Sequence, residues 1–444
     1  MNKTEKTTKT FVCKKSGQWY PFILLAPAPL IFFTIITSQI SKLPFWDDYD
    51  SVLGFLLQLR GFPDAVGKIA FILTAQHNEY RLIFENCIFA LDDSLLGHPH
   101  FALLAFIGNL SVLPICYFLW KALQRHPAEV RIAWFLPVSL ILFQLNYAET
   151  LDWAMGGLQN LAVLAFALGS LYTLSLNTRR SFAAAALFLL LAISASGNGL
   201  ILWPVCLLML VEMKRWRQAL AWFLLGLASI ALYFLHYHRN LSQTGAHPSI
   251  LHGLAHLNPA YFFSFLGSAV GENHDYIRYL SPLWGLVLFA LFLWMFHKRA
   301  WRNNRFAFYL ALFVLITALG VTCLRSDLGF GQSMSSRYKI YSDLFMIAVC
   351  IFLANLSVSK RTYRFLLTCT VLFALVNDVH GFIMLHQRGL LLQRGVEVYR
   401  HSGGTSGPVL PYSNRENLSE IEEHNQTFRV ILHQSEIRGL YRLP

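Results

Sequence analysis

The sequence predicts an all-α fold, a polytopic transmembrane helical bundle of about eleven spans. Two observations lead to this prediction. First, 55% of the 444 residues are hydrophobic and only 14% are charged, whereas a soluble globular protein has about 25% charged residues. Second, apolar runs such as Phe306–Leu324 reach the roughly 17 to 25 residues that cross a bilayer as a helix. These runs are solid, whereas a transmembrane barrel needs alternating strands of about ten residues.

The apolar segments set the expected order of the spans. A basic segment, residues 1–19, precedes the first span. The spans are expected at residues 20–40, 99–121, 132–148, 155–176, 182–195, 199–213, 218–236, 281–297, 305–323, 341–358 and 364–384. Two of these spans are short and meet at the Gly/Asn turn Ser194–Gly199, which fits either two short helices or one broken, re-entrant element.

Lys and Arg residues set the expected orientation of the chain. They cluster in the segments that follow every second apolar run, as at residues 3–15, 121–131, 214–217 and 298–305. The positive-inside rule places these clusters and the N-terminus in the cytoplasm, and an odd number of spans places the C-terminus outside. The net charge of +12 is explained by this topology. A nucleic-acid partner is therefore not expected.

Three parts are expected: the cytoplasmic segment 1–19, a transmembrane domain at 20–384 and a small outer tail at 385–444. The first outer loop, residues 41–98, is too long to be a mere connector, so function is expected there. Within it, Ser51–Leu59 and Ala65–Thr74 are apolar on one helical face and too short to span. They predict interfacial helices that lie on the membrane lipids.

An acidic pair, Asp47 and Asp48, follows the first span by only a few residues. Paired carboxylates at this position can accept a proton or bind a divalent cation. The alternative is an ordinary helix cap, a role in which Asp is common. The sequence leaves the metal requirement open.

The hexapeptide QHNEYR at residues 76–81 crowds five kinds of polar group beside the bilayer. Such density is costly there unless something compensates it. We predict that Glu79 belongs to the catalytic group with Asp47 and Asp48, and that His77 and Arg81 bind substrate. If the hexapeptide is helical, His77 and Arg81 share one face.

A Gly/Ser-rich outer segment leads into a later span and carries four further candidates for binding a phosphate or substrate. These are Arg325, Arg337, Tyr338 and Lys339. Arg matches phosphate oxygens with a planar fork, and Ser or backbone amides at a helix start supplement it. The alternative is ordinary interfacial anchoring by Arg, Tyr and Lys. Polar residues near other spans, including Glu149, Asp152, Asp343 and His380, are expected to be helix-end or interhelix hydrogen-bonding groups.

The chain resembles the GT-C superfamily of polytopic glycosyltransferases. The similarity lies in the basic N-terminus, the first span, and an outer loop that opens with Asp47 and Asp48 and contains interfacial helices. The resemblance implies transfer of a sugar from a polyprenyl-phosphate donor to a glycan or glycolipid acceptor at the periplasmic face of a bacterial inner membrane. It implies that Asp47 or Asp48 deprotonates or positions the acceptor hydroxyl, and that Arg337 holds the donor phosphate. Some superfamily members use a divalent ion and others do not.

Two other functions stay open at this point. A transporter or flippase of lipid-linked saccharides would favour charged residues at mid-membrane and an inverted repeat. An O-antigen polymerase or ligase would put more weight on Arg278, Arg325 and Arg337 than on the acidic pair. The sequence contains no P-loop, dinucleotide fingerprint, HExxH or GxSxG, so ATP-driven transport and the commoner hydrolase mechanisms find no support.

Overall fold

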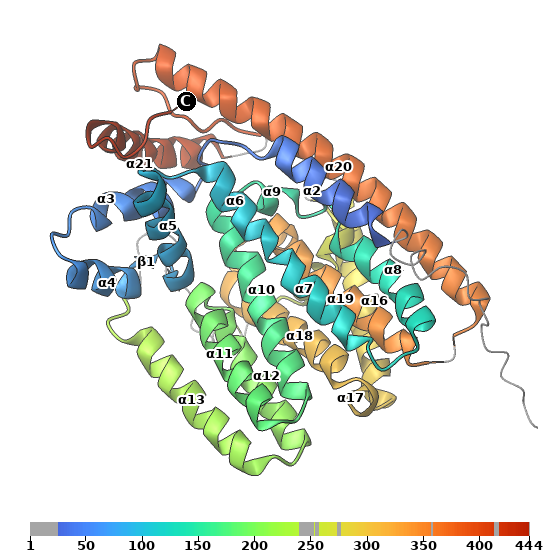
Figure 1. Ribbon diagram of the computed structural model, residues 1–444. Coiled ribbons are helices and arrows are strands. Elements are labelled where there is room, and N and C mark those ends of the chain that lie inside the picture. The colour runs from blue at the N-terminus through green and yellow to red at the C-terminus, as the bar shows by residue number, and fades with distance from the viewer. Residues whose placement is uncertain are drawn as a thin grey trace, which may run out of the picture.

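The part of the chain that the computed structural model describes comprises residues 25–238, 253, 257–272, 277–356, 358–412 and 417–443. This part is all-α apart from one short hairpin, which confirms the predicted fold class. Figure 1 shows the helices gathered into one bundle, with the longest helix along one side. The predicted cytoplasmic segment 1–19 lies outside the described residues.

The bundle is built from helices that pack around a central one. Its helices are α2 (Pro27–Gln39), α6 (Phe101–Leu110), α7 (Val112–Ala122), α8 (Ala128–Leu142), α10 (Ala154–Ser175), α11 (Arg179–Ala195), α12 (Gly199–Glu212), α13 (Trp216–Phe234), α16 (Leu280–His297), α18 (Arg305–Arg325), α19 (Ser336–Ala354) and α20 (Lys360–His401). The central helix α10 is almost wholly buried, and it contacts α6, α7, α11, α12 and α18. Apolar side chains of these helices form one large core.

Short helices connect the longer ones. They are α9 (Ala148–Leu151), α15 (Pro259–Leu266), α17 (Ala300–Asn303) and the 3-10 turns Ser268–Val270, Ile277–Tyr279, Ser326–Leu328 and Phe330–Met334.

Six helical stretches of the described residues are long and apolar enough to cross a membrane. They are Phe101–Ala122, Ala154–Ser175, Trp216–Phe234, Ile277–His297, Arg305–Leu328 and Lys360–His401. Such helices are what a polytopic membrane protein requires. Each of the eleven predicted spans coincides with helical residues, but several of these helices are shorter than a bilayer, so the number eleven stays a prediction.

The turn between α11 and α12 joins two separate helices that pack side by side. A Cβ atom added to Gly199 would lie 2.3 Å from the carbonyl carbon of Ala192, so only glycine permits this close approach. The structure therefore favours two short helices over a single broken one.

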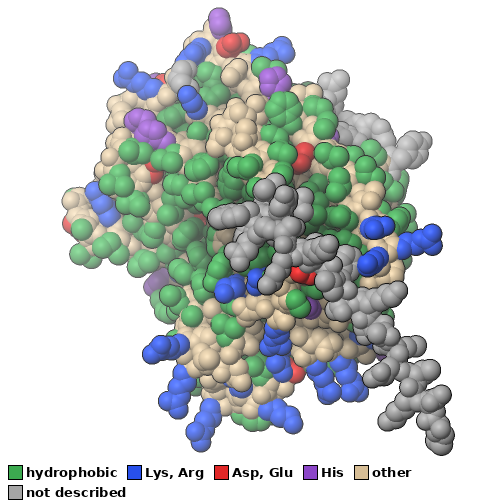
Figure 2. Space-filling view, turned by 45° about the vertical axis from the view of Figure 1, so that its right-hand side comes forward, with side chains coloured by type: hydrophobic (Ala, Val, Ile, Leu, Met, Phe, Trp, Pro, Cys, Tyr) green, Lys and Arg blue, Asp and Glu red, His purple; other side chains and the backbone are tan. Residues whose placement is uncertain are grey.

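The basic turns meet at one end of the bundle. Lys121, Arg125 and Arg302 line one small pocket beside the ends of α7 and α10, and Arg305 next to it pairs with Glu212 at 2.8 Å. Figure 2 shows Lys and Arg side chains gathered at the lower end of the molecule. We call this end the basic end, and the opposite end, which carries residues 41–98, the loop end.

A second buried core lies at the loop end. It joins apolar residues of 43–59, 82–105 and 392–443. Helix α21 (Leu418–Ile437) crosses the first loop, and Phe428 stacks on Tyr49 with 4.5 Å between ring centroids (Figure 1). The first loop and the tail therefore form one cap. Because α20 runs through residue 385 without a break, it connects this cap to the bundle.

The two predicted interfacial helices differ in burial. Residues Tyr49–Gly54 form a π-helix that continues into α3 (Phe55–Leu59), and most of these residues are buried beneath α21. The prediction that Ser51–Leu59 lies on the membrane is therefore corrected, because its apolar side chains fill the cap core. In contrast, α4 (Ala65–Thr74) buries none of its residues and exposes apolar side chains such as Val66 and Ile69.

The hexapeptide at residues 76–81 forms a hairpin. Strand β1 (Gln76–His77) pairs antiparallel with β2 (Tyr80–Arg81), and His77 lies opposite Tyr80. Asn78 adopts a left-handed conformation with φ of 50°, which the tight turn between the strands requires. The helical arrangement considered for His77 and Arg81 is therefore absent.

Helix α5 (Ile83–Leu96) buries a carboxyl group without a partner. Glu85 is fully buried, and neither carboxylate oxygen has a hydrogen-bond partner among the described residues. Burial raises the pKa of Glu85 well above its usual value, so the folded protein holds this proton more tightly than the unfolded chain. Wild-type stability therefore falls as pH rises above the ordinary Glu pKa of about 4.3.

We expect Glu85→Gln to raise the thermal unfolding midpoint at pH 8 and to raise it less at pH 5. The substitution removes a group that stays protonated in this apolar site but ionises in the unfolded chain, a difference that costs about 1.4 kcal/mol of stability for each unit of pKa between the two states. Thermal unfolding in detergent at both pH values checks this, with the exposed residue Glu423 changed to Gln as the matched control. An equal gain at the two pH values would contradict the assignment of a neutral Glu85.

Candidate functional site at the loop end

The predicted residues Asp47 and His77 lie together at the loop end. An Asp47 carboxylate oxygen (Oδ1) is 3.7 Å from His77 Nε2, and 31% of the Asp47 side chain is exposed. Asp47 enters from the turn before the π-helix, and His77 enters from β1. Asp47 and His77 are thirty positions apart in the sequence. The hairpin places His77 beside the acidic segment.

The charge state of Asp47 is set by its neighbours. Burial by itself would raise the pKa of Asp47, but His77 and the charges of Arg337 and His424 outweigh it and hold the pKa below its usual value. Burial lowers the pKa of His77, but the carboxylates of Asp47, Asp50 and Asp48 together outweigh it and raise the pKa above its usual value. Asp47 is therefore a carboxylate at neutral pH, the form that accepts a proton. Two predicted residues, Asp47 and His77, are thus brought together, and a third, Arg337, acts on Asp47 through its charge.

Asp48, the other member of the acidic pair, points into the protein. It is 1% exposed, and its two oxygens accept the backbone N–H groups of Phe45 at 3.1 Å and Met155 at 2.9 Å. Burial raises the pKa of Asp48 to about 7. The structure places Asp48 as a cap for the start of α10, in line with the helix-cap alternative, and not as a group that faces substrate.

Glu79 and Arg325 form a second contact beside the hairpin. A guanidinium nitrogen of Arg325 (Nη2) lies 3.6 Å from a Glu79 carboxylate oxygen and donates a hydrogen bond of 2.8 Å to the hydroxyl of Tyr80. This contact ties the hairpin to the end of α18. Of the predicted catalytic group, only Asp47 combines partial exposure with cationic neighbours and no direct Arg partner.

Two other predicted binding residues have structural contacts. Arg81 is buried and donates hydrogen bonds to the carbonyl oxygens of Leu232 and Leu235 at the end of α13. Tyr338 is buried against Phe265, with 4.8 Å between ring centroids. Both side chains hold helices together, and the structure therefore gives Arg81 and Tyr338 a structural role.

A polar cavity of about 720 Å³ lies at the start of α19, and its wall includes Ser335 and Ser336, the two residues before Arg337. Its wall includes Lys339, near the N-terminus of α19, and His380 from α20. Glu272 contacts both: its carboxylate pairs with the Lys339 ammonium and lies 3.5 Å from His380 Nε2. Burial would raise the pKa of Glu272, but His380 and Lys339 lower it to about 2. We call this space the α19 cavity.

Arg388 supplies a buried positive charge to the same wall. Its side chain is 2% exposed, and the guanidinium lies 3.6 Å (Nε) from an Asp152 carboxylate oxygen. The guanidinium also stacks 3.4 Å from the ring centroid of Phe45, and Nη1 donates to the carbonyl oxygen of Glu149 at 3.0 Å. Arg388 thereby connects α20 to the segment that leads to Asp47.

A second polar cavity has His77 in its wall. It has a volume of about 580 Å³. Its wall is rich in amide and other hydrogen-bonding side chains, namely Asp50, Gln58, Gln76, His77, Asn78, Thr427, Gln434 and Arg438. We call it the α21 cavity, because α21 closes one side of it.

Sequence reasoning missed four residues that surround the site: Glu272, Arg388, Glu420 and His424. Glu420 lines the α19 cavity and His424 lies one turn further along α21. Arg388 lies just after the apolar run 364–384, and an Arg at this position was a usable signal in the sequence. For the other three, no local pattern distinguishes them from ordinary polar residues.

The residues of this site do not fit a metal ion. No three His, Cys, Asp or Glu side chains are arranged to hold one within the described ranges. Asp48 is buried with both oxygens on backbone N–H groups, whereas Asp47 is partly exposed beside His77, so the two carboxylates have separate surroundings. We derive no step through a divalent cation.

Comparison with protein-family models, with curated proteins and with solved structures found no match to this chain.

Proposed function

We propose that the protein is an integral membrane glycosyltransferase that moves a sugar from a polyprenyl-phosphate donor to a cell-envelope glycan or glycolipid. The observation that carries this proposal is a charged, partly exposed Asp47 beside His77, which lines one of two polar cavities at the loop end. A transfer reaction has two substrates, and a base must lie where they meet.

In the proposed reaction, the acceptor hydroxyl attacks the anomeric carbon of the donor sugar. The Asp47 carboxylate takes the hydroxyl proton, and the bond from the sugar to the polyprenyl phosphate breaks. His77 and Arg337 keep Asp47 charged until this step. The leaving phosphate gains negative charge, so cationic hydrogen-bond donors are needed on its side of the reaction centre.

The α19 cavity is the proposed donor site. Lys339 lies near the N-terminus of α19, a helix of 19 residues, and a helix N-terminus favours a phosphate. Glu272 neutralises the Lys339 ammonium, so donor binding exchanges one anion for another at this cation. Arg388, a buried residue of the same wall, adds positive electrostatic potential to the cavity.

The α21 cavity is the proposed acceptor site. Amide, carboxylate, hydroxyl and guanidinium groups are the donors and acceptors that match sugar hydroxyls. This wall therefore favours a saccharide over an apolar acceptor.

The membrane arrangement is part of the same proposal. The eleven spans cross a bacterial inner membrane, the basic end faces the cytoplasm, and the loop end faces the periplasm. The exposed apolar side chains of α4 lie in the outer surface of the bilayer. A prenyl chain then stays in the lipid while its phosphate reaches the α19 cavity.

The test is sugar transfer by the purified protein. Proteoliposomes receive a panel of radiolabelled polyprenyl-phosphate sugars together with envelope lipids and glycans, and products are separated by chromatography. The proposal predicts a labelled product with a new glycosidic bond for at least one donor. If every donor is recovered unchanged, although the protein binds one of them, the transferase proposal is wrong.

A further inference from the structure

A third cavity, of about 750 Å³, opens at the loop end beside the first residues of α6. Its wall comes from Lys42, from residues 98–103 and from the C-terminal residues 439–442. It shares no wall residue with the α19 or α21 cavity, so the proposed transfer reaction does not use it.

The wall of this cavity carries positive or protonatable groups only. Lys42, Arg442, His98 and His100 line it, and no Asp or Glu does. Neither Lys42 nor Arg442 makes an ion pair or side-chain hydrogen bond within the described part of the chain, so their charges are not neutralised internally. The remaining wall is mostly apolar and includes Phe101 and Tyr441.

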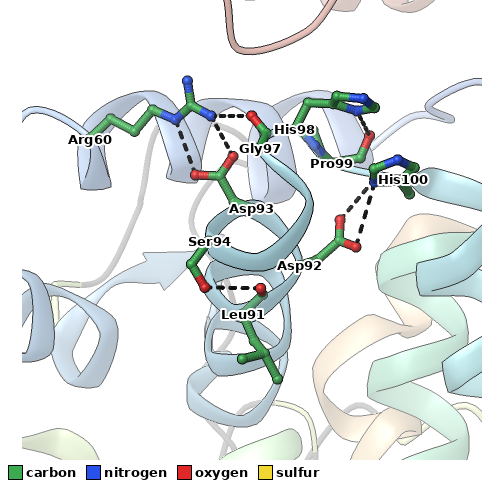
Figure 3. Close-up of polar contacts among 9 residues, drawn as sticks. All are labelled: Arg60, Leu91, Asp92, Asp93, Ser94, Gly97, His98, Pro99 and His100. Carbon is green, nitrogen blue, oxygen red and sulfur yellow. Dashed lines mark hydrogen bonds and ion pairs between the residues drawn. The ribbon is translucent and has the colours of Figure 1, made fainter.

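The segment that carries His98 and His100 is held by polar contacts at the end of α5, as Figure 3 shows. Arg60 pairs with Asp93 at 2.6 Å and donates to the carbonyl oxygen of Gly97, which fixes the end of α5. Buried Asp92 accepts the backbone N–H of His100 at 2.8 Å, and another Asp92 oxygen lies 3.8 Å from His100 Nδ1.

The rings of His98 and His100 stack with 4.1 Å between centroids. Each imidazole ring has an N–H group that can donate a hydrogen bond to a bound anion. The cavity is therefore a preformed site, and its chemistry suits an anion.

The location of the cavity indicates where the anion comes from. The membrane-length stretch Phe101–Ala122 starts in its wall. Leu103, Leu110 and Tyr117 lie seven residues apart on one face of this stretch and are all exposed. This apolar face, which we call the α6–α7 stripe, leads from the cavity along the direction in which the helix crosses the bilayer.

We propose that this cavity binds the phosphate headgroup of an anionic phospholipid of the surrounding bilayer, with an acyl chain along the α6–α7 stripe. The phosphate lies among Lys42, Arg442 and the two histidines. A zwitterionic lipid fits less well, because its ammonium group would meet no carboxylate in the wall. Phosphatidylglycerol, whose headgroup carries only negative charge, is the simplest lipid of the required class.

The test is lipid retention by the full-length protein from vesicles of equal phosphatidylglycerol and phosphatidylethanolamine, measured by native mass spectrometry. Wild type is expected to retain phosphatidylglycerol in preference. The double variant Lys42→Ala/Arg442→Ala is expected to retain about tenfold less of it, because each cation near a membrane surface contributes appreciably to anionic-lipid binding.

The matched control is Lys68→Ala/Arg394→Ala, which removes the same charge from exposed positions outside the cavity. Equal losses in both double variants, or none in either, would overturn the proposal. A second measurement does not depend on folding of the variants: wild type is cross-linked to phosphatidylglycerol that carries a photoreactive acyl chain. Cross-links are expected in residues 98–117, and cross-links confined to other helices would likewise overturn it.

Discussion

Asp47→Asn is expected to lower kcat for sugar transfer at least about 100-fold, because an amide cannot accept the acceptor proton. The apparent donor KM should change by less than about threefold, since the α19 cavity contains the proposed donor contacts and Asp47 is not among its wall residues. The measurement is initial-rate kinetics with the purified variant in proteoliposomes.

Asp327→Asn is the matched control for Asp47. Asp327 is exposed, follows α18 and lines neither cavity, so its variant should keep wild-type rates. Full activity of the Asp47 variant would remove the first-loop carboxylate from the mechanism. Activity lost equally in the Asp327 variant would point to a general effect of surface charge instead.

Arg388→Met is expected to produce the largest loss of stability, about 3–5 kcal/mol. The substitution keeps a long apolar side chain over Phe45 but leaves the buried Asp152 carboxylate without its cation. Burial raises the pKa of Asp152 to about 6 even with the guanidinium beside it. The measurement is the unfolding midpoint in detergent.

Two further variants separate the ion pair from a general effect of the substitution. Arg394→Met lies on the same helix but is exposed, and it should leave the midpoint nearly unchanged. Adding Asp152→Asn to Arg388→Met should recover part of the loss, because the uncompensated charge is then removed. An Arg388→Met protein as stable as wild type would show that the buried pair contributes nothing.

The sequence predicted the fold class well because the apolar runs are long and the basic turns alternate with them. All eleven predicted spans coincide with helical residues. The prediction that the π-helix and α3 lie on the membrane was wrong. An apolar face on a short helix has the same sequence pattern whether it packs against lipid or against protein. The cover here is α21, which lies more than 350 residues further along the chain.

The candidate site was predicted in part. Asp47, His77 and Arg337 were singled out from local polarity; Asp47 and His77 lie beside each other, and the charge of Arg337 lowers the pKa of Asp47. The distinction between Asp47 and Asp48 was beyond the sequence, because it depends on which carboxylate reaches the start of α10. The role of Arg81 could not be predicted either. Its partners are backbone carbonyl groups at the end of α13, and the side-chain sequence does not indicate such contacts.

The proposed function requires that the loop end joins a sugar to an acceptor and does not merely move a lipid-linked sugar. Proteoliposomes with labelled donor on one side allow both events to be followed in one sample, as label in acceptor product and as donor reaching the opposite leaflet. A transferase should give labelled product that depends on Asp47, with no protein-dependent movement of donor. Donor movement without labelled product would contradict it and favour a flippase.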